Sequence, residues 1–249
     1  MITKIEIATG LRHIRQFLIH PSILCSLLFW GRSGAIKKAV KISLSQVSRT
    51  PQNEINEWIT SKRMNSLIGK IGGWSQEALY YLVRYYRPKI IVETGVYRGI
   101  STAFLLQALK DNGNGYLYSI DLPLAKYTAK DGEVDFSPLS KKEETGFAVP
   151  NALRDRWKLI IGDSREELPK LLKTIKSVDL FYHDSEHTFE MMTWEFQTIF
   201  PFLTNKSVLC SDDILWNNAF QEFCGTHGLS PEFVAEKFGY AEVRNEKTS

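Results

Sequence analysis

Cysteine is scarce in this sequence: the 249 residues include three, Cys25, Cys210 and Cys224, and no two of them form a C-x-x-C pair. A disulfide framework or a zinc knuckle would need closely spaced cysteines, so we expect neither. Three scattered thiols fit a reducing compartment, and the first residues show no secretory signal pattern. We therefore expect a cytoplasmic protein.

Long apolar runs are also missing. The most apolar stretch, Phe17–Trp30, is shorter than the roughly 20 residues of a membrane-spanning helix, and Pro21 interrupts it. Basic residues flank it, so residues 11–41 are a candidate for peripheral contact with an anionic membrane surface. The alternative is a helical extension that packs against the main domain or against a second subunit in a homo-oligomer.

Charge is unevenly spread along the chain. Residues 1–50 hold eight of the 31 Lys and Arg but one of the 28 Asp and Glu, which gives this arm +7 and the remainder −4. The mildly acidic remainder does not suggest a nucleic-acid groove, and we expect no nucleic-acid partner. We divide the chain into a basic, helical N-terminal extension (1–74) and a main domain (75–249).

Short apolar runs alternate with helix-like periodicity in the main domain. Such alternation predicts an α/β fold with a mostly parallel sheet covered on both faces. Ser75 is the predicted N-cap of the first helix. The expected strands are 90–93, 116–120, 157–161, 178–183 and 207–211, with edge strands at 233–235 and 240–243; the expected helices are 78–86, 101–110, 165–173, 189–200 and 218–224.

One segment, residues 122–150, breaks this rhythm because it has little apolar periodicity. Loops of this length in compact domains are usually lids, binding loops or disordered segments. It follows a strand end, where ligands bind in open α/β sheets. We expect a lid that contributes to substrate choice.

The stretch "IIVETGVYRGIST" (90–102) predicts a strand, a glycine turn and a helix that Ser101 opens, and Ser101 is a candidate cofactor ligand. Gly95 and Gly99 are spaced G-x-x-x-G, unlike the usual phosphate-binding loops, and no lysine is present to meet phosphates. Glu93 at the strand end would repel a pyrophosphate but suits a cationic ligand such as S-adenosylmethionine. Asp121, at the end of the next strand, could accept the ribose hydroxyls. Alone, these signals would also suit a dinucleotide enzyme.

Three carboxylates follow two later strands. Asp184 lies in "HDSEH", and Asp212 with Asp213 lies in "SDDILWN". We expect them at one sheet edge, where hard oxygen ligands favour Mg²⁺, Mn²⁺ or Ca²⁺. Helix capping or pairing with Lys or Arg is the alternative. His187, with an ordinary pKa near 6.5, is the candidate general base, or else has no catalytic task, and His183 is expected to be structural or to support a neighbouring site residue.

These motifs resemble the class I S-adenosylmethionine-dependent methyltransferases. "VETGVYRGIST…YLYSIDLP" and "SDDILWN" are similar to the methyltransferase domain 24 group and to cation-dependent O-methyltransferases of the catechol and caffeoyl-coenzyme A type. The resemblance implies a Rossmann-like, doubly wound, seven-stranded sheet. It also implies that Glu93, Gly95 and Gly99 meet the methionine part of the cofactor, that Asp121 binds ribose, and that Asp163 with Ser164 flanks adenine. Asp163 could also cap the following helix.

The resemblance further implies that Asp184, Asp212 and Asp213 bind a divalent cation, most simply Mg²⁺. His187 stands where many relatives have a proton-accepting lysine. The expected reaction is metal-assisted O-methylation of a hydroxyl on a small molecule or saccharide. Two alternatives stay open: a metal-independent methyltransferase, and a non-catalytic, cofactor-binding interaction module.

Overall fold

The computed structural model describes residues 74–122, 144–234 and 237–244. Most of the predicted N-terminal extension (1–74), including the candidate membrane segment 11–41, lies outside these residues. So does most of the predicted lid (122–150). The predictions for these two segments therefore stay predictions, and the main domain carries the structural account.

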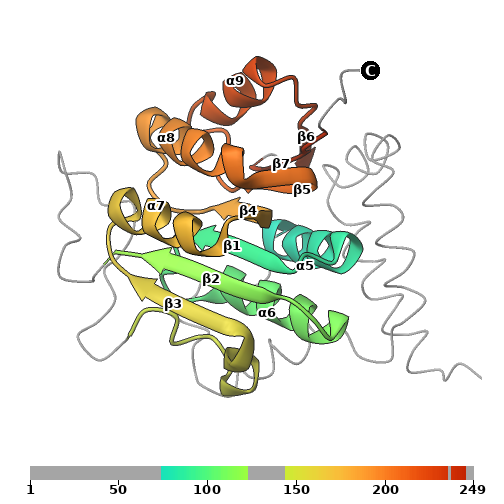
Figure 1. Ribbon diagram of the computed structural model, residues 1–249, viewed down its shortest axis with the longest axis vertical. Helices are drawn as coiled ribbons and strands as arrows, with labels where there is room; N and C mark the ends of the chain where they lie inside the picture. Colours follow the sequence, from blue (N-terminus) through green and yellow to red (C-terminus); the bar gives the residue numbers. More distant parts are fainter. Residues whose placement is uncertain (1–73, 123–143, 235–236, 245–249) are drawn as a thin grey trace, which may run out of the picture.

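A seven-stranded sheet forms the centre of the domain (Figure 1). Its strand order is β3-β2-β1-β4-β5-β7-β6, and β7 runs antiparallel to both of its neighbours while the other pairs are parallel. The prediction of a mostly parallel, Rossmann-like, seven-stranded sheet is therefore confirmed. The strands are β1 (Ile90–Thr94), β2 (Tyr116–Asp121), β3 (Trp157–Ile161), β4 (Val178–His183), β5 (Leu203–Ser211), β6 (Glu232–Val234) and β7 (Phe238–Glu242).

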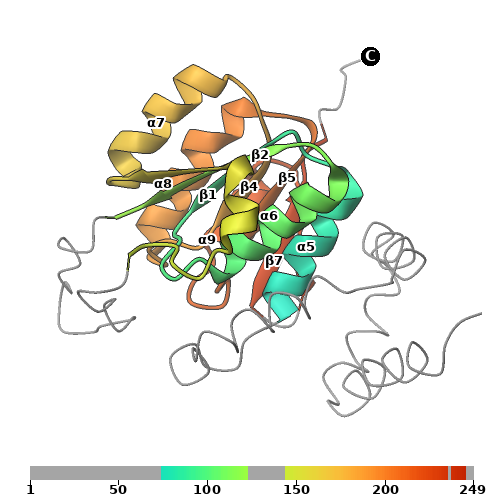
Figure 2. The ribbon, with the colours of Figure 1, turned by 90° about the horizontal axis from the view of Figure 1, so that it is seen from below.

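Helices cover both faces of the sheet, as Figure 2 shows edge-on. One apolar cluster packs α5 and α6 against the first face, and another packs α7, α8 and α9 against the second. The central strands are buried on both sides, which explains their continuous apolar runs. The α-helices are α5 (Trp74–Tyr86), α6 (Ile100–Asn112), α7 (Ser164–Ile175), α8 (Phe189–Ile199) and α9 (Ala219–Thr226), and the 3-10 helices are η4 (Asn151–Arg156) and η5 (Phe200–Phe202).

Two local predictions are wrong. Ser75 lies inside α5 instead of capping it, and its hydroxyl donates a hydrogen bond to Asp212 far along the chain. The strand predicted at 240–243 is not at the edge, because β7 pairs with β5 on one side and β6 on the other. Long-range contacts decided both positions, and local periodicity does not report such contacts.

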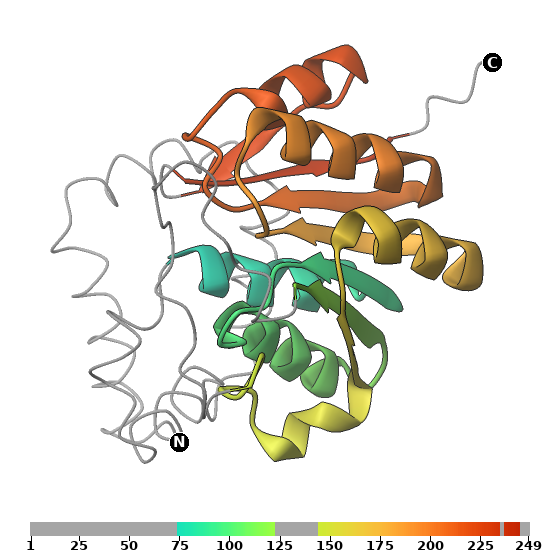
Figure 3. The ribbon, with the colours of Figure 1, turned by 90° about the vertical axis from the view of Figure 1, so that its left-hand side faces the viewer.

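The carboxyl ends of four parallel strands lie level with one another. Thr94 at the end of β1 pairs with Ile120 of β2 and with His183 of β4, and His183 pairs with Ser211 of β5. Because β7 is reversed, its first residues also lie at this edge, with Gly239 opposite Ser211. Figure 3 shows the sheet from the side, with the red C-terminal elements at one end and the yellow η4 at the other.

Two further findings concern membrane-spanning helices and cysteines. Within the described ranges, no helix is long and apolar enough to cross a membrane. Cys210 and Cys224 are buried free thiols.

Candidate active site

The glycine turn after β1 is packed against the protein itself. Gly95 has φ +84°, and a Cβ there would lie 1.9 Å from the backbone oxygen of Asp184. Gly99 has φ +87°, and its Cβ would lie 2.9 Å from the Cα of Gly146. Both glycines are therefore required by backbone conformation and by close approach of another segment. The Gly95 contact holds the predicted cofactor turn directly against the predicted metal-binding strand end.

Glu93 lies beneath this turn with no exposed surface. One of its oxygens accepts hydrogen bonds from the hydroxyls of Ser119 (2.6 Å) and Thr102 (2.8 Å). The other oxygen has no hydrogen-bond partner among the described residues. Burial raises the pKa of Glu93 from 4.5 to about 8, although these two hydrogen bonds oppose the shift. Glu93 thus supports the turn from below, and its predicted contact with the cofactor stays a prediction.

Asp121 lies at the end of β2, beside the turn. Its carboxylate accepts the backbone N–H of Tyr97 at 2.7 Å and that of Leu122 at 2.9 Å. Burial raises its pKa, and the backbone hydrogen bonds oppose the shift. A carboxylate can accept about four hydrogen bonds, so acceptor capacity remains for ribose hydroxyls.

Asp163 and Ser164 begin α7. Asp163 is the N-cap, because its side chain accepts the backbone N–H of Arg165 at 2.8 Å, as the sequence had left open. The Ser164 hydroxyl bonds to Glu195, a fully buried carboxylate on α8. The side chain of Ser164 is thus directed into the protein, which leaves its backbone for the predicted contact with adenine.

Glu195 joins several strand ends from below. It accepts hydrogen bonds from Thr94 at 2.5 Å and Ser185 at 3.0 Å, and it lies 2.7 Å from Nδ1 of His183. His183 and Glu195 are both completely buried. The structural role predicted for His183 fits this pairing. Sequence reasoning missed Glu195, whose one signal was an acidic residue on the buried face of a helix.

Asp184 follows β4 and faces the turn. Its backbone N–H donates to the carbonyl of Thr94, and its carboxylate accepts the hydroxyls of Tyr182 at 3.0 Å and Ser101 at 3.4 Å. Burial raises the pKa of Asp184 well above its usual range, and the carboxylate of Asp212 raises it further. Ser101, predicted as a cofactor ligand, therefore contacts the acidic side of the site.

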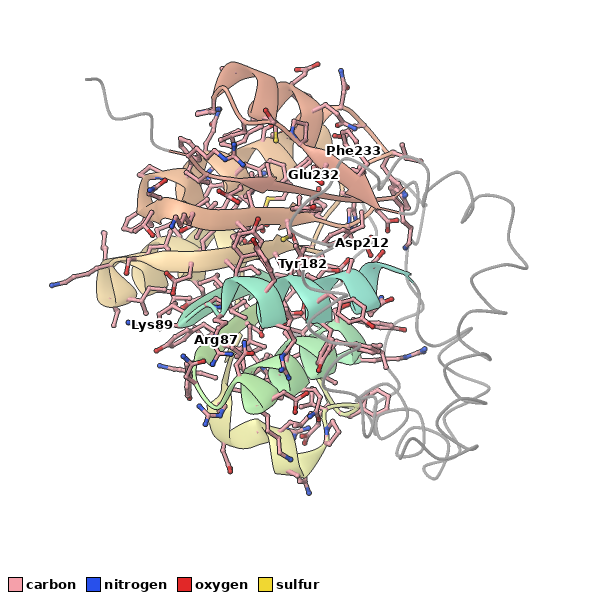
Figure 4. All side chains as sticks on the ribbon, turned by 90° about the vertical axis from the view of Figure 1, so that its right-hand side faces the viewer. Arg87, Lys89, Tyr182, Asp212, Glu232 and Phe233 are labelled. Carbon is pink, nitrogen blue, oxygen red and sulfur yellow. The ribbon has the colours of Figure 1, made fainter. Side chains whose placement is uncertain are left out.

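Asp212 and Asp213 follow β5. The backbone N–H of Asp212 donates to the carbonyl of His183, which places this pair beside Asp184. One oxygen of Asp212 accepts the Ser75 hydroxyl at 3.0 Å. Figure 4 shows Asp212 near the start of α5, with Tyr182 on the neighbouring strand. Burial raises the pKa of Asp212, while the ammonium of Lys237 opposes the shift.

Lys237, from the turn between β6 and β7, contacts both members of the pair. Its Nζ lies 3.6 Å from Asp212 and 3.3 Å from Asp213. Pairing with Lys or Arg was one of the alternatives to metal binding that the sequence left open for these acids, and Lys237 makes this pairing. Sequence reasoning missed Lys237 because its proximity to them arises from sheet topology.

His187 lies between β4 and α8, with its side chain 1% exposed. Its Nε2 is 3.8 Å from Asp184, and neither ring nitrogen has a hydrogen-bond partner among the described residues. Its ring contacts those of His183 and Trp216. Burial and the neighbouring His183 lower the pKa of His187 to about 4, so the ring is neutral at pH 7. The expectation of an ordinary pKa near 6.5 is therefore wrong.

The donor chemistry of this edge fits a hard divalent cation. Burial and, after it, neighbouring negative charges raise the pKa values of Asp184 and Asp212. The adjacent His187 ring nitrogens have no hydrogen-bond partner in the described part of the chain. Across 74–122, 144–234 and 237–244, however, no three His, Cys, Asp or Glu side chains form a ready-made metal cluster. The side chains are therefore of types that bind a divalent cation, but in this structure Lys237 contacts two of the carboxylates.

Comparisons with known proteins concern the fold of the chain. Residues 92–214 match the family model described as a methyltransferase domain. No curated protein matches the chain. Among solved structures, the chain is similar to the O-methyltransferase from Bacillus cereus in complex with S-adenosylhomocysteine, with 15% identity and a TM-score of 0.52 over 84% of this chain and 100% of that one.

It is also similar to the O-methyltransferase TomG from Streptomyces achromogenes, which is involved in tomaymycin synthesis and was solved with S-adenosylmethionine. The identity is 13% and the TM-score 0.54, over 83% of this chain and 96% of that one. The S-adenosylhomocysteine-bound methyltransferase PaMTH1 from Podospora anserina is similar as well, with 15% identity and a TM-score of 0.55 over 84% of this chain and 96% of that one. Residues 92–214 thus match a methyltransferase-domain model, and the chain shares its fold with O-methyltransferases solved with S-adenosylmethionine or S-adenosylhomocysteine.

Proposed function

We propose that this protein transfers the methyl group of S-adenosylmethionine to a hydroxyl oxygen of a small molecule or saccharide. The observation that carries the proposal is the contact between Gly95 and Asp184. It joins a turn suited to the cofactor with an acidic, histidine-containing edge suited to an acceptor hydroxyl. The structural neighbours solved with this cofactor or its product support the first half of that assignment.

The cofactor side consists of the glycine turn, Asp121 and the start of α7. Asp121 is the proposed ribose ligand, because it lies beside the turn with acceptor capacity left. Gly95 and Gly99 shape the turn along which we propose that the methionine part lies. Asp163 and Ser164 are the proposed neighbours of adenine, at a helix N-terminus that the Asp163 side chain caps.

On the acceptor side, His187 is the proposed proton acceptor. Its ring is neutral, and no group of the described ranges forms a hydrogen bond with its nitrogens, so one of them can take the proton of the acceptor hydroxyl. The acceptor oxygen then forms a bond to the methyl carbon, the carbon–sulfur bond breaks, and its electron pair stays on sulfur to give S-adenosylhomocysteine. Holding the two substrates in line supplies much of the rate of such a transfer.

We extend the proposal to a divalent cation, Mg²⁺ most simply, held by Asp184, Asp212 and Asp213. When bound, such a cation supplies positive charge that lowers the pKa of the acceptor hydroxyl. The carboxylates' oxygen chemistry and their mutual repulsion support this assignment. The contact of Lys237 with Asp212 and Asp213 favours the second candidate, a metal-independent methyl transfer.

A methyl-transfer assay with the full-length protein tests the proposal. S-adenosylhomocysteine formation would be followed over a panel of phenolic and saccharide acceptors, with added Mg²⁺ and with a chelator. We expect turnover that Asp184→Asn abolishes without weakening S-adenosylhomocysteine binding, whereas Asp121→Asn weakens that binding. Asp155→Asn, at an exposed acid on η4, is the matched control and should leave both unchanged.

Two other outcomes of the assay would contradict parts of the proposal. Turnover that survives the chelator would remove the metal from the mechanism and select the metal-independent route. Tight cofactor binding with no methyl loss on any acceptor would contradict the enzyme proposal and favour a non-catalytic binding module.

A further inference from the structure

The ammonium of Lys237 lies where a cation of the acidic edge would lie. It is 3.6 Å from one oxygen of Asp212 and 3.3 Å from one oxygen of Asp213. The other oxygen of Asp212 is held by the Ser75 hydroxyl. The backbone carbonyl of Lys237 accepts the N–H of Ile214 at 3.0 Å, which fastens the β6–β7 turn directly beside the acidic pair. The position of the lysine is thus fixed by backbone contacts as well as by charge.

The charges at this edge do not balance. Asp184, Asp212 and Asp213 carry three carboxylates, and Lys237 is the one Lys or Arg in an ion pair with any of them among the described residues. Clustered carboxylates are costly without enough positive charge. The excess of negative charge at this edge therefore favours a cation of higher charge than an ammonium.

An unpartnered side chain also points into this cluster. His187 is almost completely buried, its Nε2 lies 3.8 Å from Asp184, and neither ring nitrogen has a hydrogen-bond partner within the residues that the structure describes. A buried polar group without a partner is unfavourable unless a ligand completes it. This observation is independent of the acidic residues and indicates that a bound species belongs here.

We propose that Lys237 is the resident cation of this carboxylate site, and that a divalent cation such as Mg²⁺ or Mn²⁺ binds there by displacing the Lys237 ammonium. The lysine side chain is half exposed, and its flexible four-carbon stem allows it to swing into solvent. Metal binding is then an exchange of one cation for another. The inference deepens the metal-assisted form of the proposed function, but its test requires no turnover.

The experiment is a Mn²⁺ titration of the full-length protein, followed by electron paramagnetic resonance of the free ion. We expect Lys237→Gln to bind Mn²⁺ at least tenfold more tightly than the wild type, because the competing charge is gone. Lys237→Arg keeps the charge and should stay within a few-fold of the wild type. Lys170→Gln is the matched control, since Lys170 also contacts two carboxylates, Glu166 and Glu167, but on the exposed face of α7.

Asp212→Asn locates the ion, and we expect it to abolish Mn²⁺ binding in the Lys237→Gln background. The proposal is overturned if Lys237→Gln binds Mn²⁺ no more tightly than the wild type, if Lys170→Gln gains as much, or if no variant binds Mn²⁺. A thermal melt checks that each variant is folded. A protein that exchanges Mn²⁺ as described but transfers no methyl group would contradict the proposed function and leave this inference standing.

Discussion

At the scale of single residues, the environment of His187 determines the protonation behaviour of the site. Its side chain is buried, and both burial and His183 lower its pKa to about 4. Such a histidine is already deprotonated at pH 5, so it can accept a proton throughout the neutral range. It is also a weaker base than a free imidazole, which places more of the catalytic demand on lowering the pKa of the acceptor hydroxyl.

The pH dependence of methyl transfer tests this assignment. We expect kcat to show no inflection near pH 6.5, the usual pKa of histidine. We expect His187→Gln to lower kcat by about 10²–10⁴, the usual contribution of general-base catalysis. S-adenosylhomocysteine affinity, measured by calorimetry, should be unchanged. His227→Gln, at a histidine stacked on Phe223, is the control. An acidic limb near pH 6.5 that disappears in His187→Gln would contradict the lowered pKa.

At the scale of elements, the turn between β1 and α6 can be compared with the turn after α6. Gly95 and Gly113 both have positive φ, at +84° and +73°. A Cβ on Gly113 would meet nothing within 4 Å, whereas one on Gly95 would overlap the backbone of Asp184. An alanine at Gly113 would therefore cost only an unfavourable backbone conformation, whereas an alanine at Gly95 would cost the same conformation and a steric clash as well.

Urea unfolding of two alanine variants measures these two costs. We expect Gly113→Ala to lose about 1–2 kcal/mol, because a left-handed conformation is unfavourable for alanine. Gly95→Ala should lose more than that and should also lose S-adenosylhomocysteine binding, since the turn must move away from Asp184. Equal losses of stability with intact binding in both variants would show that the Gly95–Asp184 contact is dispensable.

The same scale shows what the sequence could predict. The strands and helices were recognised because burial on one or two faces imposes a local periodicity. The strand-end acids were placed at one edge because parallel strands share a direction. Ser75, Glu195 and Lys237 were missed as neighbours of the site, since each reaches it through a long-range contact. Hydrophobic patterning carries no information on such contacts.

At the scale of the whole molecule, Glu93 makes the stability of the domain depend on pH. Burial raises its pKa from 4.5 to about 8, so the folded state binds a proton that the unfolded state has released. Between these two values the free energy of unfolding should therefore fall as pH rises, by up to about 1.4 kcal/mol per pH unit. Above pH 8 both states are deprotonated, and this contribution becomes constant.

Glu93→Gln removes the titrating group while keeping its size. We expect the free energy of unfolding of this variant to depend less on pH than that of the wild type between pH 5 and 8, measured by urea denaturation without ligand. The difference in free energy of unfolding between this variant and the wild type should shift in favour of the variant as pH rises. Parallel stability curves for the two proteins would show that Glu93 does not titrate in this range.

The reversed direction of β7 has a consequence for how this fold can change. In a parallel strand, the end beside the ligands leads into a crossover that must return across the sheet, so its length is constrained. Because β7 is antiparallel to β5, a short hairpin turn carrying Lys237 lies at the ligand edge instead. A hairpin turn can exchange, gain or lose residues without rebuilding a layer of helices. The charge offered to an acceptor can therefore be altered at this turn while the cofactor half of the domain stays intact.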